Sequence, residues 1–262
     1  MNELTLPTDA TVLVASDMHL GDHDPGTARF FLDALDVALT GAHRASHLLL
    51  LGDLFEAWPG DDQTDPIAQL LVDRLLALSS SGVHVLVMRG NRDFLLDVRF
   101  AGNQQAAFSE QTSATMLDDP TLLRIGQNQV LLMHGDTLCT DDQAYQEFRA
   151  QNRTQQWQQA FLSESLTHRM QVARQLREQS KAHQRHVAQE ISDVNSTAVD
   201  QALSGANVAT LLHGHTHRPD RHRWSSEGQA RARYVLPDWD QTQRRGGFMR
   251  IDKSAITVMS LP

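Results

Sequence analysis

Apolar runs alternate with amphipathic stretches through the first third of the chain. Residues 11–16, 47–51 and 83–88 are short leucine-rich and β-branched runs with the length of buried strands. Residues 27–39 and 67–78, which separate these runs, carry apolar side chains at helical spacing. This order of strand, helix, strand, helix and strand predicts an α/β sheet domain.

The middle of the chain departs from that alternation. Residues 141–204 are rich in Gln, Arg and Ala, keep a helical periodicity and contain neither Pro nor Gly. We therefore expect helices that are inserted into the sheet domain and packed over it, so that residues 1–140 and 205–262 form the core. Further strands are predicted at residues 121–125, 129–133, 208–212, 231–236, 247–251 and 256–261.

Polar clusters follow five of the predicted strands directly. Loops at the carboxyl ends of strands are where α/β sheets place their ligands, so these clusters are candidate sites. They are Ser16-Asp17-Met18-His19, Gly52-Asp53, Gly90-Asn91-Arg92-Asp93, His134-Gly135-Asp136 and His213-Gly214-His215-Thr216-His217.

The clusters contain side chains that bind divalent cations. Asp17 and His19 are two residues apart, so at the end of an extended strand they project to the same side and can hold one cation together. One such pair is common in solvated surface loops, but chance does not explain ligands at five strand ends. Seven donors suffice for two cations if one carboxylate, Asp53, bridges them. The seven are Asp17, His19, Asp53, Asn91, His134, His215 and His217.

The order and spacing of these motifs over nearly the whole chain resemble the calcineurin-like metallophosphoesterases. The resemblance implies a four-layer αββα sandwich in the α/β class, with the inserted helices as a cap. It also implies two Mn²⁺ ions as cofactors. One ion would be held by Asp17, His19, Asp53 and His217, and the other by Asp53, Asn91, His134 and His215.

Longer stretches at residues 52–58, 90–96 and 134–142 are similar to one branch of this family, which cleaves the pyrophosphate of a diacylated UDP-sugar in lipid A synthesis. The implied products are UMP and a diacylated sugar 1-phosphate. The branch works at the cytoplasmic face of the bacterial inner membrane as a peripheral protein. The residues matching its substrate contacts are Asn91, Arg92, Asp142, Ser180 and His215. Two further contact positions depart from the better-known enterobacterial pattern of Asn and Lys, and here they are Gln184 and Val187.

Arg92 stands where many members of the wider superfamily carry histidine. Histidine can donate a proton to an alkoxide leaving group, whereas arginine stays charged and can only stabilise charge. A phosphate leaving group, with a second pKa of about 6, departs without a proton, so Arg92 fits a pyrophosphate substrate. We expect metal-activated water to attack the α-phosphorus in line, with Asn91, Arg92 and His134 as catalytic residues. The structural alternative for Arg92 is a surface ion pair with Asp93.

Charge and composition bear on the partners. The chain has 23 Lys and Arg against 32 Asp and Glu, a formal charge of −9, which disfavours nucleic acid as a partner. The single cysteine, Cys139, allows no internal disulfide and favours a reducing compartment. There is no secretory signal and no apolar run near the ~20 residues of a membrane-spanning helix, so we expect a soluble or peripherally bound protein without an obligate protein partner.

The insertion differs in charge from the rest of the chain. Residues 165–186 carry five Lys and Arg against one Glu, which predicts a local attraction for anions. Apolar side chains nearby either line a groove for acyl chains and touch a membrane, or simply pack onto the sheet domain. They are Trp157, Phe161, Leu162, Leu166, Met170, Val172 and Leu176.

Two other functions stay open at this point. The same chemistry could act on another nucleotide substrate, and the basic, apolar insertion favours a lipid only mildly. The chain could also be a non-catalytic scaffold of the same fold. In such scaffolds the metal ligands are eroded, whereas all seven ligand positions are filled here.

Overall fold

Two six-stranded sheets form the centre of the computed structural model, which describes residues 1–40, 44–100, 105–186, 193–259 and 261. The first sheet has the order β12-β11-β2-β3-β4-β5. Its strands β2 to β5 are parallel to one another. At one edge β11 pairs antiparallel with β2, and β12 pairs antiparallel with β11. The bounds are β2 (Val12–Ala15), β3 (His47–Leu51), β4 (His84–Met88), β5 (Thr115–Leu117), β11 (Phe248–Ile251) and β12 (Ile256–Met259).

The second sheet has the order β1-β6-β7-β8-β10-β9. It is mixed, because β7, β8 and β10 are parallel while the β6–β7 and β9–β10 pairs are antiparallel. The bounds are β1 (Asn2–Leu6), β6 (Thr121–Ile125), β7 (Asn128–Leu132), β8 (Thr210–His213), β9 (Arg221–Ser226) and β10 (Gln229–Val235).

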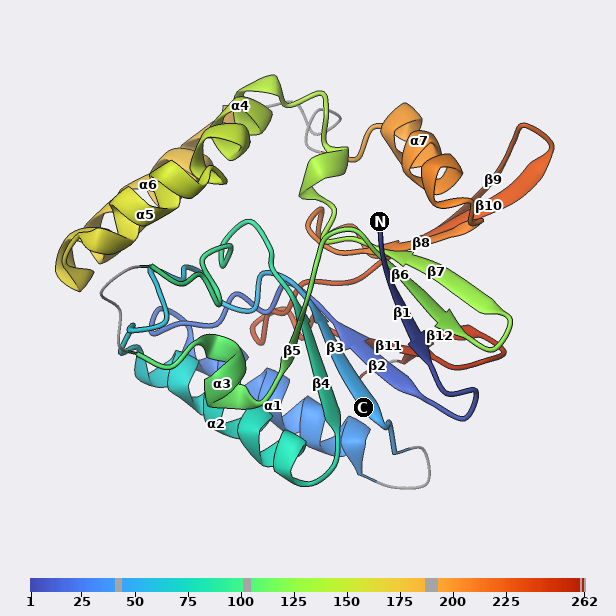
Figure 1. Cartoon of the computed structure of the whole chain (residues 1–262), viewed down its shortest axis with the longest axis horizontal. Helices are drawn as coiled ribbons and strands as arrows, with labels where there is room; N and C mark the ends of the chain where they lie inside the picture. Colours follow the sequence, from blue (N-terminus) through green and yellow to red (C-terminus); the bar gives the residue numbers. More distant parts are fainter. Residues whose placement is uncertain (41–43, 101–104, 187–192, 260, 262) are drawn as a thin grey trace.

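Helices cover the outer faces of both sheets (Figure 1). On the first sheet these are α1 (Pro25–Leu39), α2 (Pro66–Ser80) and α3 (Phe108–Thr112), and on the second it is α7 (Ser196–Ala206). Alternate side chains of β3 show the layering, since Leu48 and Leu50 pack with the helices whereas Leu49 and Leu51 fill the space between the sheets. The predicted four-layer αββα fold is confirmed.

Local sequence sets where the covering helices begin. Asp24 and Asp65 accept hydrogen bonds from backbone N–H groups in the first turns of α1 and α2. Pro25 and Pro66 then occupy the first helical positions, where no N–H is needed and the fixed φ suits a helix. Both helices therefore start at a capping residue in the segment that follows a site-forming strand.

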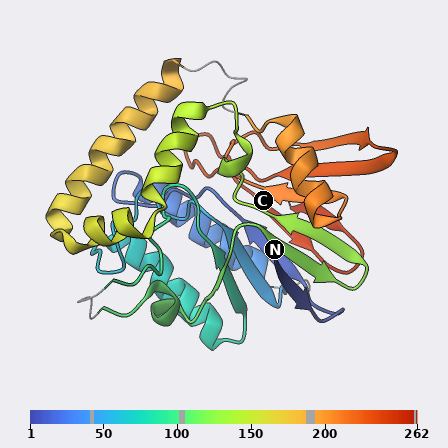
Figure 2. The same ribbon diagram turned by 45° about the horizontal axis from the view of Figure 1, so that its top comes forward.

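Three helices stand apart from these layers and are called the cap below. They are α4 (Gln143–Asn152), α5 (Gln155–Ser163) and α6 (Leu166–His186). In two views the cap spans the loops that follow the central strands (Figures 1 and 2). Helix α7 comes from the same inserted segment but packs on the second sheet through Val199 and Leu203, because its apolar side chains recur along one face. Among the described residues, no helix is both long and apolar enough to cross a bilayer.

All of the strands and helices predicted outside the insertion are confirmed, with ends that differ by at most three residues from those expected. Three strands and one α-helix were missed, namely β1, β5, β9 and α3, as was the short 3-10 helix at Asp136–Leu138. β1 and β9 are edge strands whose sequences, Asn2–Leu6 and Arg221–Ser226, are largely polar. Edge strands tolerate polar side chains on both faces, so the apolar pattern that marks buried strands is weak there.

Candidate active site

The seven predicted donors come together at the carboxyl ends of five strands, and they are called the donor cluster below. β2, β3 and β4 of the first sheet supply four of them, while β7 and β8 of the second sheet supply three. The two sheets face each other, so loops that are far apart in sequence meet at one edge. The donor cluster consists of Asp17, His19, Asp53, Asn91, His134, His215 and His217.

One half of the donor cluster is formed by Asp17, His19 and His217. His217 Nε2 lies 3.4 Å from Asp17 Oδ1 and 3.1 Å from His19 Nε2, and His19 Nε2 lies 4.0 Å from Asp17 Oδ1. Donors that share a cation at about 2.1 Å lie about 3 to 4 Å from one another. These three side chains are therefore spaced for one divalent cation.

The other half is formed by Asp53, His134 and His215, with Asn91 among them. Asn91 Oδ1 lies 3.0 Å from His134 Nε2 and 2.8 Å from His215 Nδ1. His134 Nε2 lies 3.6 Å from Asp53 Oδ1. The second carboxylate oxygen, Asp53 Oδ2, faces the first half at 3.9 Å from His19 Nδ1, so Asp53 stands between the two halves.

Hydrogen bonds within the protein, mostly to the backbone, orient these side chains without help from a ligand. His134 Nδ1 lies 2.9 Å from the carbonyl oxygen of Leu51, which can only accept, so Nδ1 carries a proton and Nε2 is the nitrogen turned toward the other donors. The Asp17 carboxylate accepts hydrogen bonds from the His215 N–H at 3.0 and 3.1 Å, and from Ser16 Oγ at 2.5 Å. The cluster is thus held by groups whose positions follow from the strands.

Five donors have left-handed backbone, which is uncommon for residues other than glycine. Asp17, His19, Asp53, His215 and His217 have φ between +50° and +64°. Such conformations cost free energy, of order 1 kcal/mol each, and persist where the surrounding structure imposes them. Their concentration in this one cluster indicates that the loops are shaped for side-chain placement.

Two glycines allow the loops to approach the carboxylates. A Cβ atom on Gly90 would lie 2.1 Å from Asp53 Oδ1, and one on Gly214 would lie 2.2 Å from Asp17 Oδ2. Both distances are far below van der Waals contact, so any larger residue would displace a donor. The Gly-Asn and Gly-His pairs of the motifs therefore have a steric cause.

Asp93 supports the cluster from behind, a role that the sequence analysis missed. It is fully buried and accepts hydrogen bonds from the N–H groups of Leu54 and Gly90, both at 2.7 Å, and of Asp53 at 3.3 Å. Burial is the main reason that its pKa is raised. The Asp93 side chain faces the backbone of two strand-end loops. It does not form the surface ion pair with Arg92 that was the alternative interpretation.

Asp136 connects the donor cluster to the cap and was also missed. Its Oδ2 accepts hydrogen bonds from Tyr145 Oη at 2.6 Å and from Arg149 Nε at 2.7 Å, both on α4. Although burial opposes its charge, His134 and Arg149 hold the pKa of Asp136 well below its usual range. The available signal was a carboxylate directly after the His-Gly pair, at the end of a buried strand.

Burial and close packing shift the proton affinities in the cluster. Burial raises the pKa of Asp53 to about 7. Burial also disfavours the charged form of His134, but Asp53, Asp17 and Asp136 outweigh it and raise the pKa to about 9. Burial and His134 lower the pKa of His215 to about 3, so its ring is neutral, the form that binds cations. Crowded ionisable groups of this kind are typical of functional sites.

The donor set fits divalent cations. Asp17 Oδ1 and the Nε2 atoms of His19 and His217 lie within 4.0 Å of one another, so one cation can bind all three. Carboxylate, amide and imidazole donors together suit divalent first-row transition-metal ions better than a purely oxygen-binding ion such as Ca²⁺. The two halves supply separate groups of donors, so the residues present fit two cations.

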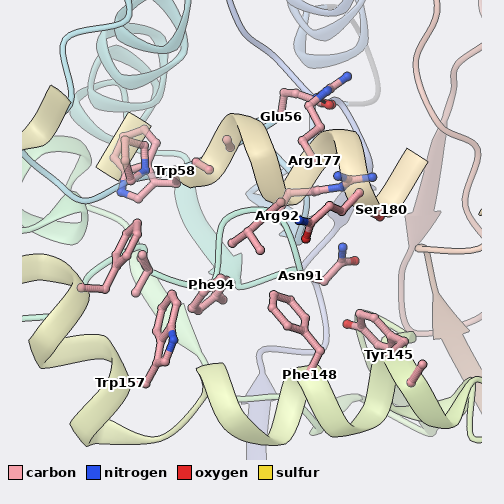
Figure 3. Close-up of a pocket in the computed structure, with 18 residues that line it drawn as sticks. Glu56, Trp58, Asn91, Arg92, Phe94, Tyr145, Phe148, Trp157, Arg177 and Ser180 are labelled. Atoms are coloured by element: carbon pink, nitrogen blue, oxygen red, sulfur yellow. Dashed lines mark ion pairs between the residues drawn. The ribbon is translucent and has the colours of Figure 1, made fainter. Parts of the chain in front are cut away.

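An apolar chamber with a cavity volume of about 250 Å³ lies beside the donor cluster, between the cap and the core. Asn91, Tyr145 and Ser180 lie toward one end of it, and Trp58 and Trp157 toward the other (Figure 3). Arg92 projects into its middle (Figure 3). The chamber therefore joins a polar end that includes a donor to an aromatic end.

The apolar side chains of the insertion divide between the two expected roles. Trp157, Phe161 and Leu176 line the chamber, as a groove for acyl chains requires. Leu162 is instead buried in the core beside Gly60, and Met170 is 44% exposed. Helices α5 and α6 turn different faces to the chamber, the core and the surface, which explains the mixture.

Two arginines of α6 are paired with the core. Arg169 is buried and donates to both carboxylate oxygens of Asp62 and to the Pro59 carbonyl. Arg177 forms an ion pair with Glu56 at the chamber wall. The anion attraction predicted for residues 165–186 is weaker as a result, because these two positive charges already have partners.

The residues predicted to contact the substrate lie in different parts of the structure. Ser180 lines the chamber with Asn91 and Arg92. Asp142 caps α4, since its Oδ1 accepts a hydrogen bond from the Tyr145 N–H at 3.0 Å. The side chain of Gln184 and the whole of Val187 lie outside the described residues.

Comparison with known proteins gives a consistent result. Residues 10–219 match the family model described as calcineurin-like phosphoesterase. The protein called UDP-2,3-diacylglucosamine hydrolase in Bordetella pertussis is 42% identical over 266 aligned positions, covering 100% of this chain and 98% of the relative. A protein with the same name in Chromobacterium violaceum is 43% identical, covering 94% of this chain and 97% of the relative.

More distant solved structures are similar as well. Vps29 of Entamoeba histolytica aligns with a TM-score of 0.44 at 16% identity, covering 95% of this chain and 89% of that one. A cold-active protein-tyrosine phosphatase of a Shewanella species aligns with a TM-score of 0.45 at 13% identity, covering 98% of this chain and 82% of that one.

Proposed function

Because the chain belongs to the calcineurin-like phosphoesterases, and among them to the family of UDP-2,3-diacylglucosamine hydrolases, we propose that it hydrolyses the pyrophosphate of UDP-2,3-diacylglucosamine. The products are UMP and 2,3-diacylglucosamine 1-phosphate, and the reaction serves lipid A synthesis. One observation carries the choice of substrate. An apolar chamber opens directly beside the donor cluster, and Asn91 belongs to both.

The chamber supports a lipid in preference to a small nucleotide. Its aromatic end, where Trp157 and Phe161 stack at a ring distance of 4.9 Å, is lined by apolar side chains and so suits acyl chains better than a second phosphate. Apolar chains transferred there from water gain about 25 cal/mol for each Å² buried. A substrate whose phosphates reach the donor cluster would thus place its acyl chains along the cap.

Two Mn²⁺ ions are the cofactors in this proposal. Asp17, His19, Asp53 and His217 would hold one, and Asp53, Asn91, His134 and His215 the other. When bound, such ions lower the pKa of a coordinated water so that hydroxide is available near neutral pH. His134 and Asn91 present Nε2 and Oδ1 to this space, because the Leu51 carbonyl and the adjacent imidazoles orient them.

Arg92 stabilises the negative charge of the phosphate leaving group in this proposal. Its side chain enters the chamber next to Asn91 (Figure 3), while its own N–H donates to Asp53 Oδ1 at 2.8 Å. This hydrogen bond fixes the Arg92 backbone beside Asp53, the residue that stands between the two halves of the donor cluster. A permanently charged donor stabilises the oxygens of a phosphate leaving group, which needs no proton to depart.

The cap is proposed to hold the diacylated sugar, so that residues 141–204 act as the insertion and residues 1–140 and 205–262 as the catalytic core. Ser180 and the aromatic end of the chamber lie where a lipid bound between cap and core would pass. Asp142, Gln184 and Val187 remain proposed contacts to its headgroup. Because the substrate resides in a bilayer, we place the protein peripherally at the cytoplasmic face of the inner membrane.

Hydrolysis of the authentic lipid, with UMP release as readout, tests the proposal. We expect release to require Mn²⁺, to stop after chelation, and to return when Mn²⁺ is restored. UDP-N-acetylglucosamine, which lacks acyl chains, is the matched control and should be hydrolysed far more slowly. Equal turnover of both substrates would indicate a general nucleotide pyrophosphatase. If neither substrate is hydrolysed in the presence of Mn²⁺, the protein is a binding scaffold and not an enzyme of this kind.

A further inference from the structure

A carboxylate stands directly behind one imidazole of the donor cluster. Asp238, in the loop after β10, is 7% exposed, and its Oδ2 lies 3.5 Å from His217 Nδ1. The other ring nitrogen, Nε2, points the opposite way, toward Asp17 and His19. The His217 ring therefore has Asp238 on one side and the cation donors on the other.

Arg245 fixes the position of this carboxylate. Its Nε donates to Asp238 Oδ1 and its Nη2 to Asp238 Oδ2, both at 2.6 Å. Two parallel charge-assisted hydrogen bonds set the plane of a carboxylate as well as its distance. Arg245 is itself tied to the loop, because its backbone N–H and C=O pair with those of Asp240 at 2.9 Å.

The loop that carries Asp238 is also attached to the site from the other direction. The N–H of Trp239 donates to the carbonyl oxygen of Asp17 at 3.2 Å. The Trp239 ring packs edge-on against Phe31 and Phe248, with ring centroids 4.9 and 5.1 Å apart. Asp238 therefore sits on a segment fixed by both the core and a donor residue.

His217 needs such support more than the other histidines. Its side chain is 38% exposed, whereas that of His134 is fully buried and has its Nδ1 fixed by the Leu51 carbonyl. A ring at the edge of the site can turn or carry its proton on either nitrogen. A carboxylate at Nδ1 selects the tautomer in which Nε2 is free to bind a cation.

We propose that Asp238, clamped by Arg245, is a positioning residue that fixes the ring and tautomer of His217 and thereby sets the cation affinity of the Asp17, His19 and His217 half. The inference rests on the proposed function, because it requires a cation there. It adds a role for residues outside the seven donors and outside the chamber.

Calorimetric titration of the metal-free, full-length protein with Mn²⁺ tests this inference. Asp238→Ala should weaken one of the two Mn²⁺ sites by about 10- to 100-fold, the range for lost outer-sphere partners. Asp238→Asn keeps an oxygen facing Nδ1 but lacks the charge, so it should weaken the same site less, by about tenfold. Asp240→Ala, in the same loop and also beside Arg245, is the matched control and should bind both ions like the parent.

The outcomes separate this inference from the proposed function. If the Asp238→Ala and Asp238→Asn variants both bind the two ions as tightly as the parent, the inference is wrong and the proposed function is unaffected. A loss of equal size in Asp240→Ala would also overturn it, because loop packing and not the carboxylate would then be responsible. If Asp238→Ala does not fold, the isosteric Asp238→Asn decides alone. A folded parent that binds no Mn²⁺ would refute the proposed function itself.

Discussion

The donor cluster and the cap are held in place by different kinds of contact. In the donor cluster, left-handed backbone, close glycines and buried hydrogen bonds such as those of Asp93 position each donor. The cap depends on a few side chains, chiefly Arg169 with Asp62 and Asp136 with Arg149.

The difference has a functional meaning. Reacting groups must be held to within a fraction of an ångström, which rigid strand ends provide. A chamber for flexible acyl chains needs apolar surface and tolerates movement. We therefore expect changes in the donor cluster to stop the chemistry while the fold survives, and changes in the cap to alter substrate binding while cation binding survives.

The largest effect is expected at the carboxylate between the two halves. Asp53→Asn should lower kcat/KM for the lipid by about 10³-fold, since cation contributions to such reactions amount to several kcal/mol. Mn²⁺ titration should show fewer ions bound, and the melting temperature of the metal-free protein should not fall, because a buried charge is removed. Asp9→Asn, at an exposed position, is the control. An Asp53→Asn variant as active as the parent would contradict the expectation that changes in the donor cluster stop the chemistry.

Arg92→Ala should come next, with a loss of about 10²- to 10³-fold in kcat, as for other groups that stabilise developing charge. Both Mn²⁺ ions should still bind, because Arg92 supplies only a backbone N–H to Asp53. Arg92→Lys should recover part of the rate, since charge returns without the planar donor geometry. Arg99→Ala, which removes an exposed arginine from the same loop region, should behave like the parent.

Arg169→Leu should loosen the cap. Removing one partner of a buried ion pair costs about 3 kcal/mol, so the cap should open more often and be cleaved faster by a protease. KM for the lipid should rise, while Mn²⁺ titration should match the parent. Arg174→Leu, on the exposed face of the same helix, is the control. A loss of Mn²⁺ affinity in Arg169→Leu would show that cap and donor cluster are coupled.

The smallest effect should follow from filling the chamber. Ala173 lines it from α6, so Ala173→Trp should raise KM for the diacylated substrate roughly tenfold, equivalent to about 1.4 kcal/mol of lost binding. Hydrolysis of a water-soluble phosphodiester should be unaffected. Gln175→Trp adds the same ring on an exposed part of α6 and should change neither reaction. Equal KM values for both variants would mean that the chamber does not hold the acyl chains.

Much of the fold could be predicted because the buried strands carry a strong apolar signal. The five residues of β3 are all buried, and the matching leucine run was recognised at its observed bounds. By contrast, β9 alternates exposed and partly exposed residues, among them Arg221 and Arg223, and has no such signal. The position of α7 on the second sheet was not predictable either, since its helical pattern does not say which surface it covers.

The sequence by itself determined the chemistry of the site: which residues are donors, that five strands end in them, and that Arg92 cannot donate a proton. The tertiary structure decided how they are grouped and what supports them. Asp17 and His217 are distant in sequence but 3.4 Å apart in space, and Asp93, Asp136 and Asp238 act through contacts that no local pattern encodes. The periodicity and the residue types of a sequence describe residues that are near one another along the chain. The distances between separate loops depend instead on how the two sheets pack together.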